Sequence, residues 1–415
     1  MPNGLAVATL RRLGAIAVAV ATSTMPTLAQ STSPSPFPTP ASKQTAARPA
    51  ADGDHTPFAL FPIRPLWTIE LNSRITQAPA YDDRRGYFAL EHDRIVAYDL
   101  ASGARQWIVA ASPQLPLSAG GDLLFLVEPE TLTALRTTDG SIAWQLPFAE
   151  KIVVPLAWDN GWLIAATAGN EILAFRGSDG ELIWRREIGT TANARPSLAE
   201  DRVYVPTTDG RVIALRVDTG EPVWERSVGG AAGEILPLPQ RLYVGSKDNA
   251  FYCLLTRDGT IDWRWRTGAD IVGAAAFDER RVYFVALDNV LRALDRKSGG
   301  QVWKASLPLR PTAGALNAGG TIIVSGSGPD LHGFNAKDGK PAGDIPGSSD
   351  LAAPPHVVPR SADGLPVLIA VTQDIAKGST VWAVTRSIEP ALAPLAPLPG
   401  LVTVPLTLPL TTSSR

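Results

Sequence analysis

The chain has 415 residues, 45% of them apolar and 19% charged, so it can bury at least one core, and general disorder is excluded. Its 38 basic and 40 acidic residues give a formal charge of -2, which removes the electrostatic basis for binding nucleic acid. The 36 glycines and 36 prolines favour many short strands joined by tight turns, and therefore an all-β protein.

The first 29 residues have the layout of a secretory signal peptide. Arg11 and Arg12 precede an apolar run at 13–21, and small residues up to Ala29 supply a cleavage site. The run is far shorter than the roughly 20 residues that a membrane-spanning helix needs, so no transmembrane span is expected. No cysteine lies near the cleavage site, which predicts a periplasmic or secreted protein that is not a lipoprotein. Residues 30–57, rich in Pro, Ser and Thr, predict a flexible linker.

A repeat of about 40 residues extends through the predicted domain, residues 58–386. In each unit a turn glycine is followed four residues later by tryptophan, and four short strands with hairpin signals lie between successive motifs. The glycine and tryptophan pairs are Gly103 with Trp107, Gly140 with Trp144, Gly180 with Trp184, Gly220 with Trp224, Gly259 with Trp263, and Gly299 with Trp303. Four-stranded units at this period predict the blades of a β-propeller.

The two ends of the repeat array predict a closed ring of eight blades. Trp67 lies 40 residues before Trp107 but has no turn in front of it, and Gly343 stands at the last tryptophan position. Counting from Trp67 to Gly343 gives eight such positions. We therefore expect the strand 66–71 to be the outermost strand of the final blade, beside residues 380–384, which would remove the exposed sheet edges.

This turn-plus-tryptophan pattern resembles the tryptophan-docking motif of pyrroloquinoline quinone (PQQ) propellers. The resemblance covers about 67–386, and it implies that the tryptophans pack between neighbouring blades. Gly343 departs from the motif and puts the packing of the seventh blade in doubt. The family includes quinoprotein dehydrogenases and cofactor-free outer-membrane assembly proteins such as BamB, so fold alone does not choose between them. The residues that would have this docking role are Trp67, Trp107, Trp144, Trp184, Trp224, Trp263 and Trp303.

Catalytic patterns are sparse in the repeats. A PQQ dehydrogenase holds a quinone and usually calcium, and the alcohol dehydrogenases of the family place adjacent cysteines beside the cofactor. Here Cys253 is alone in an apolar run and is interpreted as a core residue. The four histidines, expected at the surface or in loops, are scattered along the chain at His55, His92, His332 and His356. We expect no bound cofactor or metal and no enzyme activity. A small PQQ-dependent oxidoreductase is the alternative.

The connections between blades supply a candidate binding site. Charged residues lie about seven positions past most of the eight tryptophan positions, or slightly later, where they would ring one mouth of the channel; a solvated loop rim is the plain alternative. These residues are Arg74, Lys151, Arg195, Glu234, Asp270, Arg310 and Asp350. On the opposite face, Trp158 and Trp162 flank a hairpin and are interpreted as a cross-strand aromatic pair.

The tail 387–415 is rich in Pro and Leu, which predicts an extended segment. Together these features favour an exported, monomeric scaffold. Its expected partner is another protein or peptide of the cell envelope, to which mixed surface charge is suited.

Overall fold

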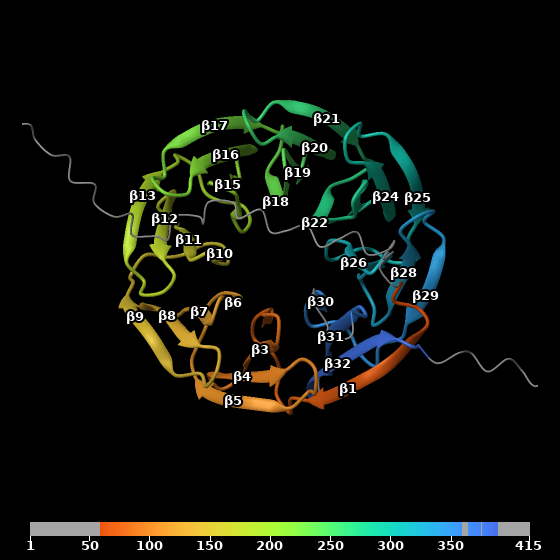
Figure 1. Cartoon of the computed structure of the whole chain (residues 1–415), viewed down its shortest axis with the longest axis horizontal. Coiled ribbons are helices and arrows are strands. Elements are labelled where there is room, and N and C mark those ends of the chain that lie inside the picture. Colours follow the sequence, from red (N-terminus) through yellow and green to blue (C-terminus); the bar gives the residue numbers. More distant parts are fainter. Residues whose placement is uncertain (1–58, 359–363, 375, 389–415) are drawn as a thin grey trace, which may run out of the picture. The chain divides into compact units, whose positions relative to one another are not determined.

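All regular structure in the described residues is β-strand. The computed structural model describes residues 59–358, 364–374 and 376–388. Their strands form eight antiparallel sheets of four that are arranged in a ring (Figure 1). The arrangement confirms the all-β, eight-bladed propeller that the repeat predicts. The predicted signal peptide and linker, and all but two residues of the predicted tail, lie outside the described residues.

Blades 1 to 4 run from the innermost to the outermost strand in chain order. Their strands are β2 (Ala80–Tyr81), β3 (Arg85–Leu90), β4 (Arg94–Asp99), β5 (Arg105–Ala110), β6 (Ser118–Gly120), β7 (Leu123–Val127), β8 (Thr131–Arg136), β9 (Ile142–Pro147), β10 (Ala157–Asp159), β11 (Trp162–Ala166), β12 (Glu171–Arg176), β13 (Leu182–Glu187), β14 (Ser197–Ala199), β15 (Arg202–Pro206), β16 (Arg211–Arg216) and β17 (Pro222–Ser227).

Blades 5 to 7 repeat this order, and blade 8 takes its outermost strand, β1, from the start of the domain. Their strands are β18 (Ala232–Leu238), β19 (Arg241–Ser246), β20 (Ala250–Leu255), β21 (Ile261–Arg266), β22 (Ile271–Phe277), β23 (Arg281–Ala286), β24 (Val290–Asp295), β25 (Gln301–Ser306), β26 (Leu316–Ala318), β27 (Thr321–Val324), β28 (Leu331–Asn335), β29 (Pro341–Ile345), β30 (His356–Val358), β31 (Val367–Asp374), β32 (Gly378–Arg386) and β1 (Ile63–Glu70).

The ring closes as the sequence predicts. Strand β1 pairs antiparallel with β32, with Trp67 opposite Ala383 and Glu70 opposite Thr380 (Figure 1). The strand begins at Ile63, three residues earlier than predicted. Because β1 and β32 come from opposite ends of the domain, their pairing joins the first and last parts of the repeat array without an open sheet edge.

Strand position explains the burial of the side chains. The second and third strands of a blade lie between neighbouring blades, and β11 is buried throughout. The outermost strands have one face toward solvent and alternate, as β13 does: Trp184 is 8% exposed, whereas Leu182 is 43% exposed. The period of two therefore aims each outer-strand tryptophan at the next blade.

Seven tryptophans join successive blades through the same hydrogen bond. In each case the indole Nε1 donates to a backbone carbonyl in the turn between the third and fourth strands of the next blade, at 2.7 to 3.3 Å. The donor and acceptor residues are Trp67 and Leu100, Trp107 and Thr137, Trp144 and Gly177, Trp184 and Val217, Trp224 and Thr256, Trp263 and Arg296, and Trp303 and Ala336.

The turn glycines receive these indole rings. Gly220 lies against the ring of Trp184, so a Cβ atom there would be 2.5 Å from the ring, and its φ of +68° is also unfavourable for other residues. The glycine of each motif therefore contacts the tryptophan of the preceding blade, not the one four residues later. Each turn needs a residue that tolerates a positive φ and leaves room for the indole ring, which explains why glycine and tryptophan recur together.

Phe61 fills the seam between blades 7 and 8, where Gly343 replaces tryptophan. Cβ atoms added at Gly333 and Gly343 would lie 2.4 and 2.6 Å from the Phe61 ring. Leu60 is fully buried between the two blades, and its N–H donates to Thr321 Oγ1 at 3.0 Å. The segment before β1 thus packs the seam that the repeat leaves without a tryptophan.

Candidate functional site

The two faces of the ring differ in the connections that they carry. We call the face with the connections from the outermost strand of one blade to the innermost strand of the next the loop face. The opposite face, with the turns between strands one and two and between strands three and four, is the turn face.

Most of the predicted rim residues occupy equivalent positions on the loop face. The backbone carbonyl oxygens of five of them each accept a hydrogen bond from an N–H at the end of the second strand of the same blade or just past it. The five are Arg74, Lys151, Asp270, Arg310 and Asp350, at 2.8 to 3.0 Å. Arg195 and Glu234 lie a few residues further along in blades 4 and 5, as their sequence positions indicate.

Six rim side chains make no hydrogen bond or ion pair through their charged groups within the described residues, although the charges of Arg195 and Glu234 interact at longer range. Among the described residues, no hydrogen bond or ion pair involves the charged groups of these six, and Asp270 is half-buried while the other five are exposed. The six are Lys151, Arg195, Glu234, Asp270, Arg310 and Asp350. Exposed, unpaired charges of this kind remain available to an incoming molecule.

The charges are ordered around the ring. Arg74, Lys151 and Arg195 give blades 1 to 4 a basic arc, and Glu234 and Asp270 give blades 5 and 6 an acidic one. Arg310 and Asp350 continue with one charge of each sign. The rim therefore offers opposite charges on different parts of one face, which a mixed-charge protein segment could match.

Arg195 and Glu234 interact electrostatically on this face. Arg195 is exposed to solvent, yet desolvation by the surrounding protein lowers the pKa of its guanidinium, and the charge of Glu234 opposes that shift.

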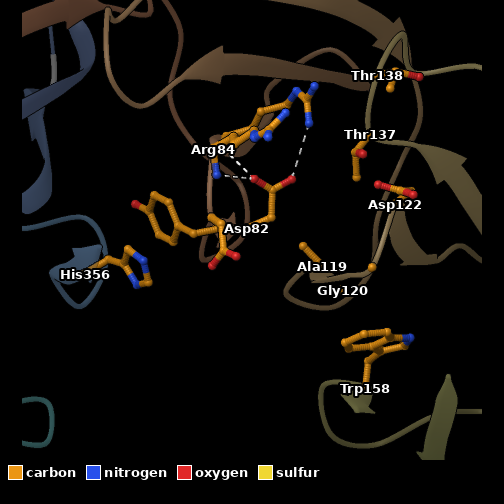
Figure 2. A pocket seen from close by; sticks show the side chains of 13 residues that line it. Asp82, Arg84, Ala119, Gly120, Asp122, Thr137, Thr138, Trp158 and His356 are labelled. Atoms are coloured by element: carbon orange, nitrogen blue, oxygen red, sulfur yellow. Dashed lines mark hydrogen bonds and ion pairs between the residues drawn. The ribbon is translucent and has the colours of Figure 1, made fainter. Parts of the chain in front are cut away.

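A cavity of about 620 Å³ lies on the turn face (Figure 2). Asp82 is held at its edge, because its carboxylate accepts hydrogen bonds from the N–H groups of Arg84 and Arg85 at 2.7 and 2.6 Å and from Tyr87 Oη at 2.5 Å. His356 and Trp158 approach the cavity from two other blades (Figure 2).

His356 forms one wall of this cavity with Tyr81. The rings are stacked with centroids 4.1 Å apart, and burial lowers the pKa of His356 to about 4, so the imidazole is neutral near pH 7. The interpretation of His356 as a surface or loop histidine is wrong, because it lies on β30 against the neighbouring blade. The sequence signal was its place in the apolar run that contains β30.

Trp158 forms the facing wall and does not pair with Trp162. Trp158 lies opposite Leu163 in the ladder, and Trp162 lies opposite Asp159. Instead, Trp158 packs on the turn of the preceding blade, where a Cβ atom at Gly120 would be 2.0 Å from the indole. The expected cross-strand pair is therefore wrong, because the register is offset by one residue and places Trp158 and Trp162 on opposite faces of the sheet.

Cysteine and metal-ligand chemistry is limited in the described part of the chain. Cys253 is fully buried, and burial raises the pKa of its thiol to about 12, so it remains protonated. Residues 59–358, 364–374 and 376–388 contain no group of three or more His, Cys, Asp or Glu side chains that could hold a metal ion. The same residues contain no helix long and apolar enough to cross a membrane.

Eight four-stranded blades, tryptophan-docked turns and an N-terminal closing strand define a propeller of the quinoprotein type. The sequence matches the family described as outer membrane protein assembly factor BamB over 64–151, 112–235, 233–350 and 291–402. These matches span more than half of the chain, which therefore belongs to this family. No curated protein sequence matches the chain significantly.

Solved structures show the same fold in proteins with different activities. BamB from Moraxella catarrhalis is 18% identical, with a TM-score of 0.63, and the alignment covers 78% of this chain and 99% of that chain. Quinohemoprotein alcohol dehydrogenase from Comamonas testosteroni is 13% identical, also with a TM-score of 0.63, and covers 78% of this chain and 76% of that chain. At these identities the likeness establishes the fold alone.

Proposed function

We propose that this protein is a non-catalytic scaffold that binds a protein or peptide of the cell envelope through its loop-face rim. The observation that carries the proposal is a set of six charged side chains on the loop face, one in each of six blades, that make no hydrogen bond or ion pair within the described residues. The family description, an outer membrane assembly factor, supports an envelope location. The N-terminal signal pattern supports export, although it lies outside the described residues.

The charges of the rim favour a protein partner over a polyanion. A basic arc beside an acidic one steers a segment of mixed charge and fixes its orientation, whereas a nucleic acid would be repelled by Glu234 and Asp270. Rim charges act mainly on the rate of association and on its salt dependence. We therefore expect binding that weakens as ionic strength rises.

Site-specific photocrosslinking in the native host tests this proposal. A photoreactive residue at position 195 or 350 should yield the same envelope protein as a crosslinked product. The same probe at Arg257 or Lys337, exposed on the turn face, should not. Arg195→Glu and Lys151→Glu should each weaken capture of that protein. Equal crosslinking from both faces, or unchanged capture by both variants, would contradict a rim site.

A PQQ-dependent oxidoreductase is the second candidate, and the fold shared with quinohemoprotein alcohol dehydrogenase favours it. A ligand that binds the native state raises the melting temperature by mass action. Melting the purified protein with saturating PQQ and calcium therefore separates the two functions. The scaffold proposal expects no shift beyond that produced by calcium alone, whereas a saturable shift with PQQ would favour the oxidoreductase.

A further inference from the structure

A second cavity, of about 480 Å³, lies on the turn face at the seam between blades 5 and 6. Turn residues before β19, before β23 and after β24 line it, together with the start of β19. Its volume is in the range of small-ligand sites. The charged residues of its lining are Arg241, Arg280, Arg296, Lys297, Glu279 and Asp295.

Two of these side chains are held by neighbouring residues of the protein. The Asp295 carboxylate accepts hydrogen bonds from the N–H groups of Lys297 and Ser298 and from Ser298 Oγ, at 2.8 to 3.0 Å, within its own turn. Arg241 is paired with Asp262 at 3.0 Å. Neutral donors leave the Asp295 carboxylate charged, so Arg280, Arg296 and Lys297 face two acids, Glu279 and Asp295, and the cavity keeps a positive excess of one charge.

Arg296 is fixed in place without being neutralised. Its Nη1 donates to the carbonyl oxygens of Asp278 and Glu279 at 2.9 and 3.2 Å, and its guanidinium lies 5.7 Å from the centroid of the Phe277 ring. Carbonyl groups and a ring face orient the guanidinium but carry no compensating charge. In the described part of the chain, the exposed side chains of Arg280 and Lys297 make no hydrogen bond or ion pair.

The basic character belongs to this seam and not to the repeat. At the seam between blades 6 and 7, Gly320 occupies the place of Arg280, and Ala336 the place of Arg296. Only Lys337, the counterpart of Lys297, retains its charge there. The repeat therefore supplies the turns, while blade 6 alone combines three cations in them.

We propose that this cavity binds a phosphate group through Arg280, Arg296 and Lys297. A phosphate carries more than one charge and several acceptor oxygens, which matches three cations that line one cavity better than a single carboxylate does. The pre-oriented guanidinium of Arg296 lowers the ordering cost of binding. A free phosphate ester and a phospholipid headgroup present the same chemistry to this cavity.

Calorimetric titration of the signal-free chain with inorganic phosphate, at constant ionic strength, tests the proposal. Because a hydrogen bond to a charged group contributes about 1.5 to 3 kcal/mol, Arg280→Glu and Lys297→Glu should each weaken binding at least about tenfold. Lys337→Glu, with the same charge change at the equivalent turn position, should leave the affinity unchanged. All three side chains are exposed, so matched melting temperatures verify folding.

The source of the phosphate is resolved by sedimentation with vesicles of phosphatidylglycerol or of phosphatidylcholine. Binding to phosphatidylglycerol that Arg280→Glu abolishes identifies a headgroup, whereas phosphate binding without vesicle binding identifies a soluble ester. The proposal is overturned if phosphate shows no saturable binding or if Lys337→Glu is as damaging as Lys297→Glu. It is also overturned if acetate displaces phosphate at equal concentration, because the cavity would then be a carboxylate site.

Discussion

Seven seams of the propeller use a tryptophan, and the eighth uses a phenylalanine from outside the repeat. In each of the seven, an outer-strand indole meets the glycine turn of the next blade. Blade 8 has no such turn, because its third and fourth strands, β32 and β1, come from opposite ends of the domain. A tryptophan at position 343 would have no turn carbonyl to bind, and Phe61 fills the space above Gly343 instead.

This difference teaches that the repeat stabilises the ring locally but cannot close it. Each docked tryptophan needs a turn of continuous chain between the third and fourth strands of the next blade. Closure depends on two chain segments, β1 and β32, that meet only when the whole ring has formed, so the loss of β1 should affect the domain most. The predictions below challenge this contrast.

Truncation at the closing strand should have the largest effect. Removing residues 1–57 should be nearly silent, because that segment consists of the predicted signal peptide and a linker with little apolar surface to bury. Removing residues 1–72 should expose the edge of β32 and strip Trp67 from its site, lowering the melting temperature and promoting association. Differential scanning calorimetry and light scattering measure both. If both truncated proteins have the melting temperature of the mature protein and remain monomeric, β1 does not close the ring.

Loss of one docked tryptophan should have the second-largest effect on stability. Trp184→Ala removes a buried indole and its hydrogen bond to Val217, and should lower the free energy of unfolding by about 3 to 5 kcal/mol. Leu182→Ala, on the exposed face of the same strand, should change it by less than about 1 kcal/mol. Urea titration compares the two, and a loss below about 1 kcal/mol for Trp184→Ala would show that the indole does not lock the seam.

Phe61 should matter less than a tryptophan because it is only partly buried. Phe61→Ala should cost about 2 to 3 kcal/mol, and Phe61→Leu, which keeps most of the apolar volume, less than about 1.5 kcal/mol. Ile388→Ala is the control, since Ile388 is 69% exposed. Urea unfolding midpoints rank the stabilities of the three variants. Equal losses for Phe61→Ala and Ile388→Ala would mean that Phe61 does not pack the seam between blades 7 and 8.

The smallest effect should be a pH dependence from His356, where blade 8 meets blade 1. Its folded pKa, about 4, lies below its ordinary value of 6.5, so the unfolded chain takes up the proton first. The stabilisation of the folded state that comes from the neutral imidazole is therefore complete above pH 6.5 and is lost as the pH falls toward 4. Allowing for solvent screening, we expect this change to lower the free energy of unfolding by about 1 to 2 kcal/mol.

Replacing the imidazole isolates that contribution. His356→Phe keeps a ring against Tyr81 but cannot titrate, so its urea stability should fall less between pH 7 and pH 4.5 than that of the wild type. His92→Gln, at an exposed position, should retain the wild-type pH dependence. An unchanged pH dependence in His356→Phe would assign the effect to other groups.

The candidate site was predictable from the sequence only in part. The rim positions follow from the repeat, because equivalent blades place equivalent residues on one face. The cavity walls do not, since Tyr81 and His356 are 275 residues apart in the sequence and meet only because the ring closes. The positive cavity between blades 5 and 6 likewise combines turns from two blades, and no local motif marks it.

By itself the sequence determined the blade count, the strand order and the closing partner of Trp67, because short strands, glycine turns and a fixed period are local properties. Only the tertiary structure decided which blade each glycine serves, how Phe61 replaces the eighth tryptophan, and which charges remain unpaired. These features depend on contacts between neighbouring blades, and a contact energy exists only once distant segments have been brought together.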